Sequence, residues 1–163
     1  MKDRTIMFKS GCEPELMPLR IKYRDKKKWY NPFSWFVEEE KTMWQLLKPI
    51  YIIYATEITS YSFTIPNGFK TDLASIPKTF WSIISPLDPE IIKSSILHDY
   101  LYSAGTTTKA MADYIFLVSL KEDGCSFVKR QAIYNAVRIG GWSAWNKCRK
   151  KDKKNKKDKR DAK

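Results

Sequence analysis

Helix start and stop signals follow one another through the second half of the chain, and no other feature constrains its fold as strongly. Asp88 is a good N-cap before a proline at the first helical position, and Gly105 ends the same segment. These signals predict a helix over residues 89–103. Similar cap and glycine signals predict two further helices over residues 108–122 and 126–139.

The first half instead carries short runs of aromatic and β-branched residues between polar or turn segments, which is typical of β-strands. The clearest strand is residues 58–65, where apolar and polar residues alternate with a period of two. Shorter strands are predicted at residues 5–9, 19–23, 35–39 and 42–47. Strands followed by helices predict an α+β fold, with a small N-terminal antiparallel sheet and a three-helix C-terminal part.

The net charge of +12 is concentrated at the C-terminal end of the chain. Residues 147–163 contain 11 Lys and Arg against three Asp, a net charge of +8, which leaves +4 for residues 1–146. No large apolar residue follows Cys148, so we expect a disordered tail or a helical extension. The predicted organisation is a single α+β domain, residues 1–146, and a Lys-rich tail, residues 147–163.

Several classes of protein are excluded by what the chain lacks. Three widely spaced cysteines, Cys12, Cys125 and Cys148, form neither a disulfide framework nor a zinc pattern. No apolar run approaches the roughly 18 residues of a membrane span, and no signal peptide is visible. We therefore expect a protein made in the cytoplasm, or packaged into a particle assembled there.

The candidate functional site is centred on His98, the only histidine of the chain. Imidazole titrates nearest to neutral pH, so His98 is the candidate general base. Tyr102 shares its side of the predicted helix, whereas Asp99 points about 100° away and could hold a cation. Alternatively, a lone histidine on a helix satisfies a hydrogen bond in the core.

Two other segments supply polar side chains to this site. The loop at residues 66–77 contains Thr71, Asp72 and Ser75, and a loop between a strand and a helix is a common place for a site. Asp113, on the next predicted helix, could orient the imidazole of His98 through a hydrogen bond. The structural alternatives are local capping for the loop residues and a favourable helix-dipole contact for Asp113.

Together, residues 65–77, 98–102 and 112–116 resemble the domain-of-unknown-function family 1353 of phage and prophage proteins. The resemblance covers roughly residues 40–145. It implies a phage-encoded origin and a polar site, and it implies no known activity.

A second resemblance suggests chemistry. His98-Asp99-x-x-Tyr102, followed by Ala112-Asp113, is similar to the active-site helices of secretory and parvoviral phospholipase A-two. It implies that His98 activates water, Asp113 orients His98 and Tyr102 supports the pair. Asp99, with Asp72 from the loop, would hold calcium or another divalent metal that polarises an ester carbonyl. The glycine-rich calcium loop of those enzymes is absent before His98.

Three functions are compatible with these features. The first is a metal-assisted hydrolase that uses His98 on lipid or cell-envelope material. The second is a non-catalytic virion or assembly component, in which the same residues form a structural polar network and the partners are other virion proteins. The third is binding of nucleic acid, an anionic surface or an acidic partner through residues 147–163. For the third, a solubilising tail is the structural alternative.

Overall fold

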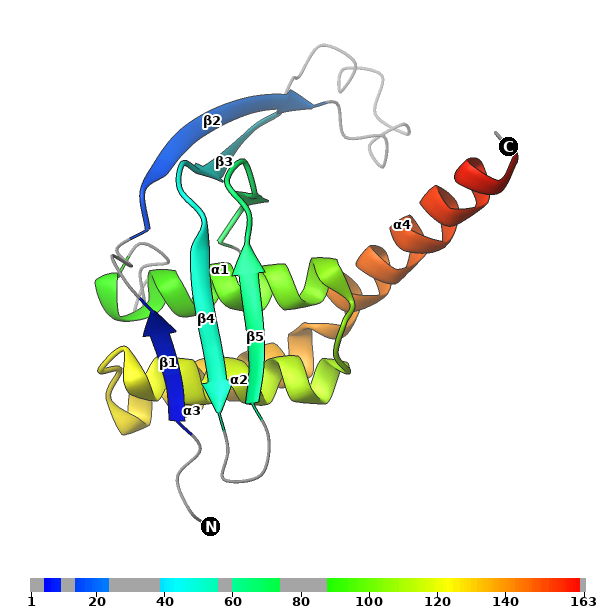
Figure 1. Ribbon diagram of the computed structural model, residues 1–163. Helices are drawn as coiled ribbons and strands as arrows, with labels where there is room; N and C mark the ends of the chain where they lie inside the picture. Colours follow the sequence, from blue (N-terminus) through cyan, green and yellow to red (C-terminus); the bar gives the residue numbers. More distant parts are fainter. Residues whose placement is uncertain (1–4, 10–13, 24–38, 56–59, 74–87, 162–163) are drawn as a thin grey trace.

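The computed structural model describes residues 5–9, 14–23, 39–55, 60–73 and 88–161 (Figure 1). Within these ranges strands come first and helices follow, as the sequence predicts. The elements are β1 (Thr5–Lys9), β2 (Leu16–Tyr23), β3 (Glu39–Leu46), β4 (Ile50–Ala55), β5 (Ser60–Ile65), β6 (Lys70–Thr71), α1 (Pro89–Ala104), α2 (Lys109–Glu122), α3 (Phe127–Gly140) and α4 (Trp142–Asp161).

The described strands form two antiparallel three-stranded sheets, in the orders β1-β4-β5 and β2-β3-β6. The chain passes from one sheet to the other three times, the first time between β1 and β2. The other two passages, between β3 and β4 and between β5 and β6, form corners. Backbone hydrogen bonds join these corners: Gly68 N–H donates to the carbonyl of Leu46 (2.7 Å), and Leu46 N–H donates to that of Phe69 (2.9 Å). Gly68 has φ +76°, which a glycine adopts without strain.

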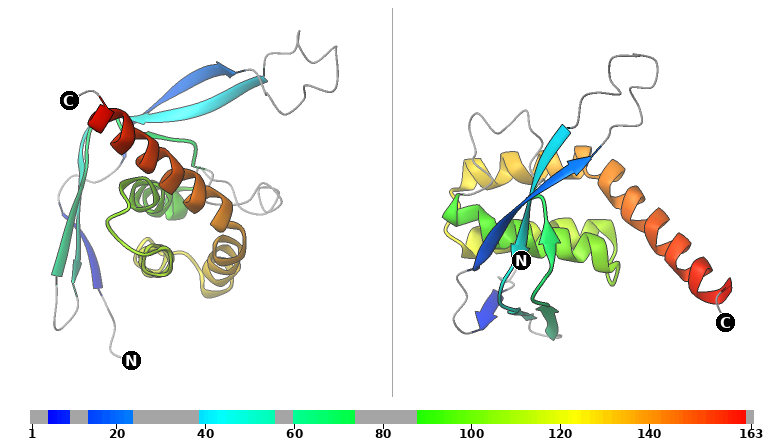
Figure 2. Two further views of the ribbon diagram at one scale, coloured as in Figure 1. Left: turned by 90° about the vertical axis from the view of Figure 1, so that its right-hand side faces the viewer. Right: turned by 90° about the horizontal axis from the view of Figure 1, so that it is seen from above.

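Side chains of the β1-β4-β5 sheet pack on helices α1 and α2, so the fold is layered (Figure 2). Ile50, Ile52 and Tyr54 alternate with more exposed residues along β4 and point into this layer. A second apolar cluster lies among α1, α2 and α3, and Figure 2 places α3 on the side of α2 away from the sheet. The polar site described below lies between the same three helices.

Helix boundaries agree closely with the cap signals. The Asp88 side chain accepts from Glu90 N–H, and Gly105 ends α1 with φ +63°. Thr108 caps α2 by accepting from Met111 N–H at 3.2 Å. Among the described helices, none is long and apolar enough to cross a bilayer.

Three details differ from the sequence-based expectation. The single small sheet is two sheets, because the chain bends at the corners near Leu46 and Ile65. Residues 50–55, which the sequence analysis did not assign, form the central strand β4. The basic segment is helical, one of its two expected states, but α4 begins at Trp142, before the expected boundary at residue 147. Residues 35–38 and 58–59 of the expected strands lie outside the described residues.

Candidate functional site

A cluster of four polar side chains lies between α1 and α2, and we call it the Asp113 cluster: His98, Tyr102, Lys109 and Asp113. His98 and Tyr102 stand one turn apart on α1, and Lys109 and Asp113 stand one turn apart on α2. Helical spacing of four residues places each pair on one face of its helix. The two pairs therefore meet where the helices pack together.

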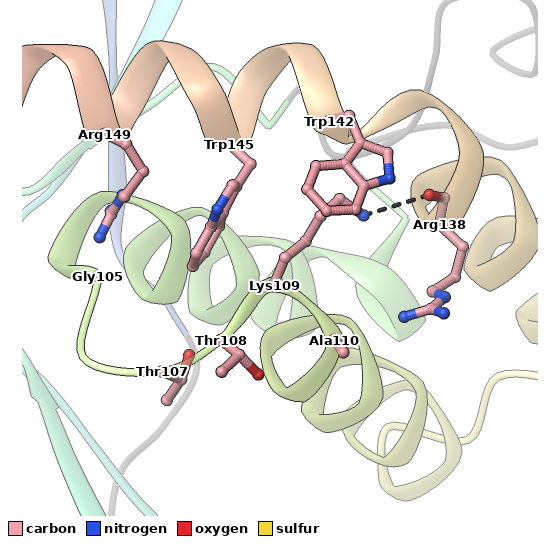
Figure 3. A pocket seen from close by; sticks show the side chains of 9 residues that line it. All are labelled: Gly105, Thr107, Thr108, Lys109, Ala110, Arg138, Trp142, Trp145 and Arg149. Atoms are coloured by element: carbon pink, nitrogen blue, oxygen red, sulfur yellow. Dashed lines mark hydrogen bonds between the residues drawn. The ribbon is translucent and has the colours of Figure 1, made fainter.

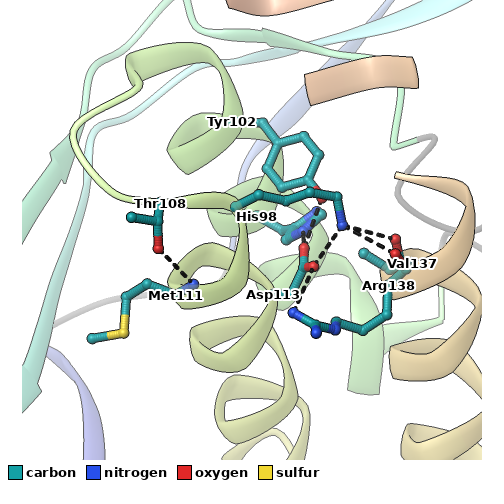
Figure 4. Close-up of polar contacts among 8 residues, drawn as sticks. His98, Tyr102, Thr108, Met111, Asp113, Val137 and Arg138 are labelled. Atoms are coloured by element: carbon teal, nitrogen blue, oxygen red, sulfur yellow. Dashed lines mark hydrogen bonds and ion pairs between the residues drawn. The ribbon is translucent and has the colours of Figure 1, made fainter. Parts of the chain in front are cut away.

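Both oxygens of the Asp113 carboxylate are engaged (Figure 4). His98 Nε2–H donates to Asp113 Oδ1 at 3.1 Å, and Tyr102 OH donates to the same oxygen at 2.7 Å. Lys109 Nζ lies 2.7 Å from Oδ2, and Arg138 Nη1 lies 3.9 Å from it at the edge of the cluster. Because an ionised carboxylate only accepts, Nε2 of His98 carries the hydrogen of this bond.

The cluster is almost completely removed from solvent. His98 is 2% exposed, Asp113 0% and Lys109 5%. The imidazole also contacts two aromatic rings, with centroid distances of 4.2 Å to Tyr102 and 4.6 Å to Phe116. A buried charge is tolerated only when it is paired and hydrogen-bonded, and Asp113 meets both conditions.

Burial and hydrogen bonding act in opposite directions on the pKa of Asp113. Burial raises this pKa, but hydrogen bonds from His98, Lys109 and Tyr102 outweigh burial and lower the pKa below its ordinary value of 3.8. The pKa of Tyr102 is raised, first by burial and then by its hydrogen bond to Asp113. The carboxylate is therefore ionised and the phenol neutral at neutral pH.

Lys109 also joins the cluster to the end of α3. Its ammonium donates to the carbonyls of Val137 (3.4 Å) and Arg138 (3.3 Å) as well as to Asp113. These carbonyls belong to the last turn of α3, and that of Val137 also accepts from the backbone N–H of Gly141 at 2.8 Å. One lysine thus links α2 to α3 and compensates the charge of Asp113.

Asp99, the neighbour of His98, takes part in a separate set of contacts. Thr71 Oγ1 donates to Asp99 Oδ2, and Leu73 N–H donates to Thr71 Oγ1 at 3.0 Å. These bonds attach the end of β6 to α1. Leu73 has φ +52°, an uncommon conformation for a residue with a branched side chain.

The predicted metal ligands were Asp72 and Asp99. No three His, Cys, Asp or Glu side chains among those residues form a group that could hold a metal ion. Asp72 and Asp99 as ligands of calcium or another divalent metal stay a prediction. Ser75, in the same predicted loop, lies outside the described residues.

The structure thus brings together His98, Tyr102 and Asp113, the three residues predicted to act in catalysis. Their catalytic role itself stays a prediction. Lys109 was not predicted, although a lysine four residues before an aspartate on one helix is a recognisable pairing signal. The carbonyls of Val137 and Arg138 were not predicted either, because no local pattern indicates which helix end packs beside Lys109.

Comparisons with known proteins match the middle of this chain. The family described as "Protein of unknown function (DUF1353)" matches residues 44–137, which include the whole Asp113 cluster. The chain belongs to the DUF1353 family. A phage origin and a likeness to phospholipase A-two stay predictions.

One relative also matches part of the chain. An uncharacterized protein, y4jT of Sinorhizobium fredii (strain NBRC 101917 / NGR234), is 36% identical over 78 residues. The match covers 47% of this chain and 23% of that relative, so it spans less than a quarter of the relative's length. No solved structure matches.

Proposed function

We propose that this chain is a non-catalytic component of a phage or prophage particle, or of its assembly machinery, and that α4 binds nucleic acid. One observation carries the proposal: one side of α4 forms a shallow basic groove. It has a volume of about 600 Å³ and is lined by Ser143, Asn146, Lys147, Lys150, Lys151 and Lys154. We call this surface the α4 groove.

The charge of the α4 groove favours a phosphate backbone. Four of its six lining residues are lysines, and none is acidic. Lysines that neutralise phosphates release counterions, which gives affinity without base recognition. Figure 1 shows α4 extending away from the layered body, so an elongated polyanion can lie along it.

The apolar content of α4 argues against a lipid surface. An interfacial helix needs a continuous apolar face on one side. After Trp145, only Cys148 and Ala162 interrupt a run of polar and charged residues. A solvated polyanion is therefore a better partner for α4 than a bilayer.

The Asp113 cluster supports the non-catalytic part of this proposal. A histidine that acts as a general base needs a ring nitrogen that the substrate can reach, and a partner that stabilises the imidazolium. His98 is 2% exposed, and Lys109 compensates Asp113 before His98 gains any proton. The cluster is better suited to holding α1, α2 and α3 in one arrangement.

Binding of labelled 20-nucleotide single strands and 20-base-pair duplexes, followed by anisotropy from 50 to 200 mM NaCl, tests this proposal. Replacing Lys150, Lys151 and Lys154 with Gln should reduce the slope of log affinity against log salt by about 2 for single strands and 3 for duplexes. The matched control replaces three exposed lysines outside α4, Lys48, Lys70 and Lys121, with Gln. Equal losses in both triple variants would contradict the proposal, as would equally tight binding of poly-glutamate or anionic vesicles.

A hydrolase is the second candidate, and the pairing of His98 with Asp113 favours it. In that function Nδ1 of His98 would take a proton from water, while Asp113 and Tyr102 hold the ring in orientation. Incubation of the full chain with phospholipid vesicles and short-chain esters, with calcium or with EDTA, tests it. Turnover that disappears in His98→Gln and persists in Glu122→Gln would support the hydrolase and contradict the non-catalytic proposal.

A further inference from the structure

A second hollow lies at the base of α4, and we call it the base hollow. It has a volume of about 590 Å³, within the usual range for small-molecule sites. Figure 3 shows it between the α1–α2 turn, the end of α3 and the first turns of α4. Its lining residues are Gly105, Thr107, Thr108, Lys109, Ala110, Arg138, Trp142, Trp145 and Arg149, none of them acidic.

The cations of the base hollow are held in place by contacts of their own. Lys109 is anchored by Asp113 and by α3 carbonyls. Arg149 donates to the carbonyls of Tyr102 and Ser103, and its guanidinium lies 4.7 Å from the Trp145 ring centroid. The Arg138 side chain is 45% exposed and borders the hollow. Preorganised cations lose little side-chain freedom when an anion binds.

Trp142 supplies an aromatic surface at the rim. It is 57% exposed, although tryptophan is highly buried in most folded proteins. Lys109 Nζ lies 5.2 Å from its ring centroid, a cation–π distance that orients the indole. Trp145, one turn further along, packs edge-on against Tyr102 with centroids 5.1 Å apart. Trp142 therefore offers a stacking surface, and Trp145 forms a wall.

Thr107 adds a hydroxyl without a protein partner. Its Oγ1 is buried and has no hydrogen-bond partner among the described residues. Buried polar atoms in folded proteins almost always have partners, and the exceptions call for an explanation. Because Thr107 lines the base hollow, a polar ligand there would complete its hydrogen bonding.

From these features we propose that the base hollow binds one nucleotide of a single-stranded nucleic acid, with its base stacked on Trp142 and its phosphate beside Arg138. The inference rests on the proposed function, because the α4 groove would hold the neighbouring phosphates. Trp142 and Lys147 lie within two turns of each other on α4, and their side chains are about 140° apart around the helix axis, so a strand that contacts both must wind around α4. A duplex keeps its bases stacked internally, so only a single strand can offer a base to Trp142.

The test compares a fluorescein-labelled 12-nucleotide oligo(dT) with a 12-base-pair duplex, both titrated with the full chain in 100 mM NaCl. Trp142→Leu should weaken single-strand binding about tenfold and leave duplex binding unchanged, because stacking contributes only to the single strand. Trp142→Phe, which keeps an aromatic ring, should restore most of the single-strand affinity. The matched control is Phe127→Leu, an exposed aromatic residue outside the base hollow.

The outcomes separate this inference from the proposed function. If Trp142→Leu leaves single-strand affinity unchanged while the Lys150, Lys151 and Lys154 variant loses binding, the α4 groove stands and the base hollow proposal is wrong. If Trp142→Leu and Phe127→Leu weaken binding equally, the proposal is also wrong. Thermal melting of each variant checks that the fold is retained, and Thr107→Val gives a second, smaller loss of about threefold in single-strand affinity if the hydroxyl contacts the ligand.

Discussion

The Asp113 cluster and the α4 groove both contain lysine side chains, but the surroundings of these lysines are opposite. In the cluster, one carboxylate is surrounded by three or more donors and excluded from water. Along α4, the described lysines of the groove have exposed ammonium groups and no acidic residue beside them in its lining. Charges in a low-dielectric interior fix neighbouring elements in place, whereas exposed charges are screened by salt and act on partners.

The largest expected effect comes from removing the centre of the cluster. Asp113→Ala leaves Lys109, Tyr102 and His98 buried without their shared acceptor, so the free energy of unfolding should fall by about 3–5 kcal/mol. Urea denaturation at pH 7, followed by tryptophan fluorescence, measures this change. Glu122→Ala, at the exposed end of α2, should change it by less than about 0.5 kcal/mol. Similar values for the two variants would show that the cluster does not hold the helices together.

The stability difference between wild type and Asp113→Ala should also depend on pH. The folded-state pKa of Asp113 lies below its ordinary value of 3.8, so its stabilising contribution is present above that value and is lost as the pH falls through the folded-state pKa. The stability difference between wild type and Asp113→Ala should therefore shrink below about pH 4. A difference that stays constant to pH 2 would mean that the ionised carboxylate contributes nothing.

Gly141 lies between α3 and α4, next to Tyr102 and Lys109 of the Asp113 cluster. A Cβ atom there would lie 2.5 Å from the Val137 carbonyl oxygen and 2.6 Å from the Tyr102 hydroxyl. Gly141→Ala should lower the free energy of unfolding by about 1–3 kcal/mol, because the backbone carbonyl cannot move away freely. Ser143→Ala, exposed on the next turn, is the control for urea denaturation. If Gly141→Ala is as stable as wild type, α4 is not tightly joined to the cluster.

A smaller loss is expected when one donor to Asp113 is removed. Tyr102→Phe should cost about 1–1.5 kcal/mol at pH 7, since His98 and Lys109 still satisfy the carboxylate. The pKa of Tyr102 is raised above its ordinary value of 10.0, so its contribution is complete below pH 10 and is lost at higher pH. The gap between wild type and Tyr102→Phe should therefore narrow above pH 10, as measured by urea denaturation. The exposed Tyr61→Phe should show no such narrowing.

We expect the smallest effect on stability from substitutions in α4. Replacing Lys150, Lys151 and Lys154 with Gln should change the free energy of unfolding by less than about 0.5 kcal/mol, because surface charges contribute little to folding. Thermal melting at low and high salt measures it. A loss as large as that of Tyr102→Phe would remove the distinction between the two regions.

Local signals in the sequence predicted most of the helical half. Asp88, Thr108 and Gly105 mark helix ends through contacts with residues a few positions away, so a linear pattern contains them. Helical spacing also placed His98 and Tyr102 on one face of α1. Strand β4 was missed although residues 50–55 are rich in β-branched and aromatic residues. Its pairing with β5 is local, and only its pairing with β1 joins segments distant along the chain. The contact between His98 and Asp113 was a hypothesis from the polar residues on two successive predicted helices, and the structure shows this contact.

By itself, the sequence determined the order of strands and helices, the helix caps and the concentration of positive charge in the last residues, because each depends on neighbours along the chain. Only the tertiary structure decided which groups share Asp113, that Asp99 turns to Thr71 instead, and that Lys109 and Trp142 meet at the base of α4. Those outcomes depend on how whole helices pack, since packing sets the distances between side chains that no spacing in the sequence encodes.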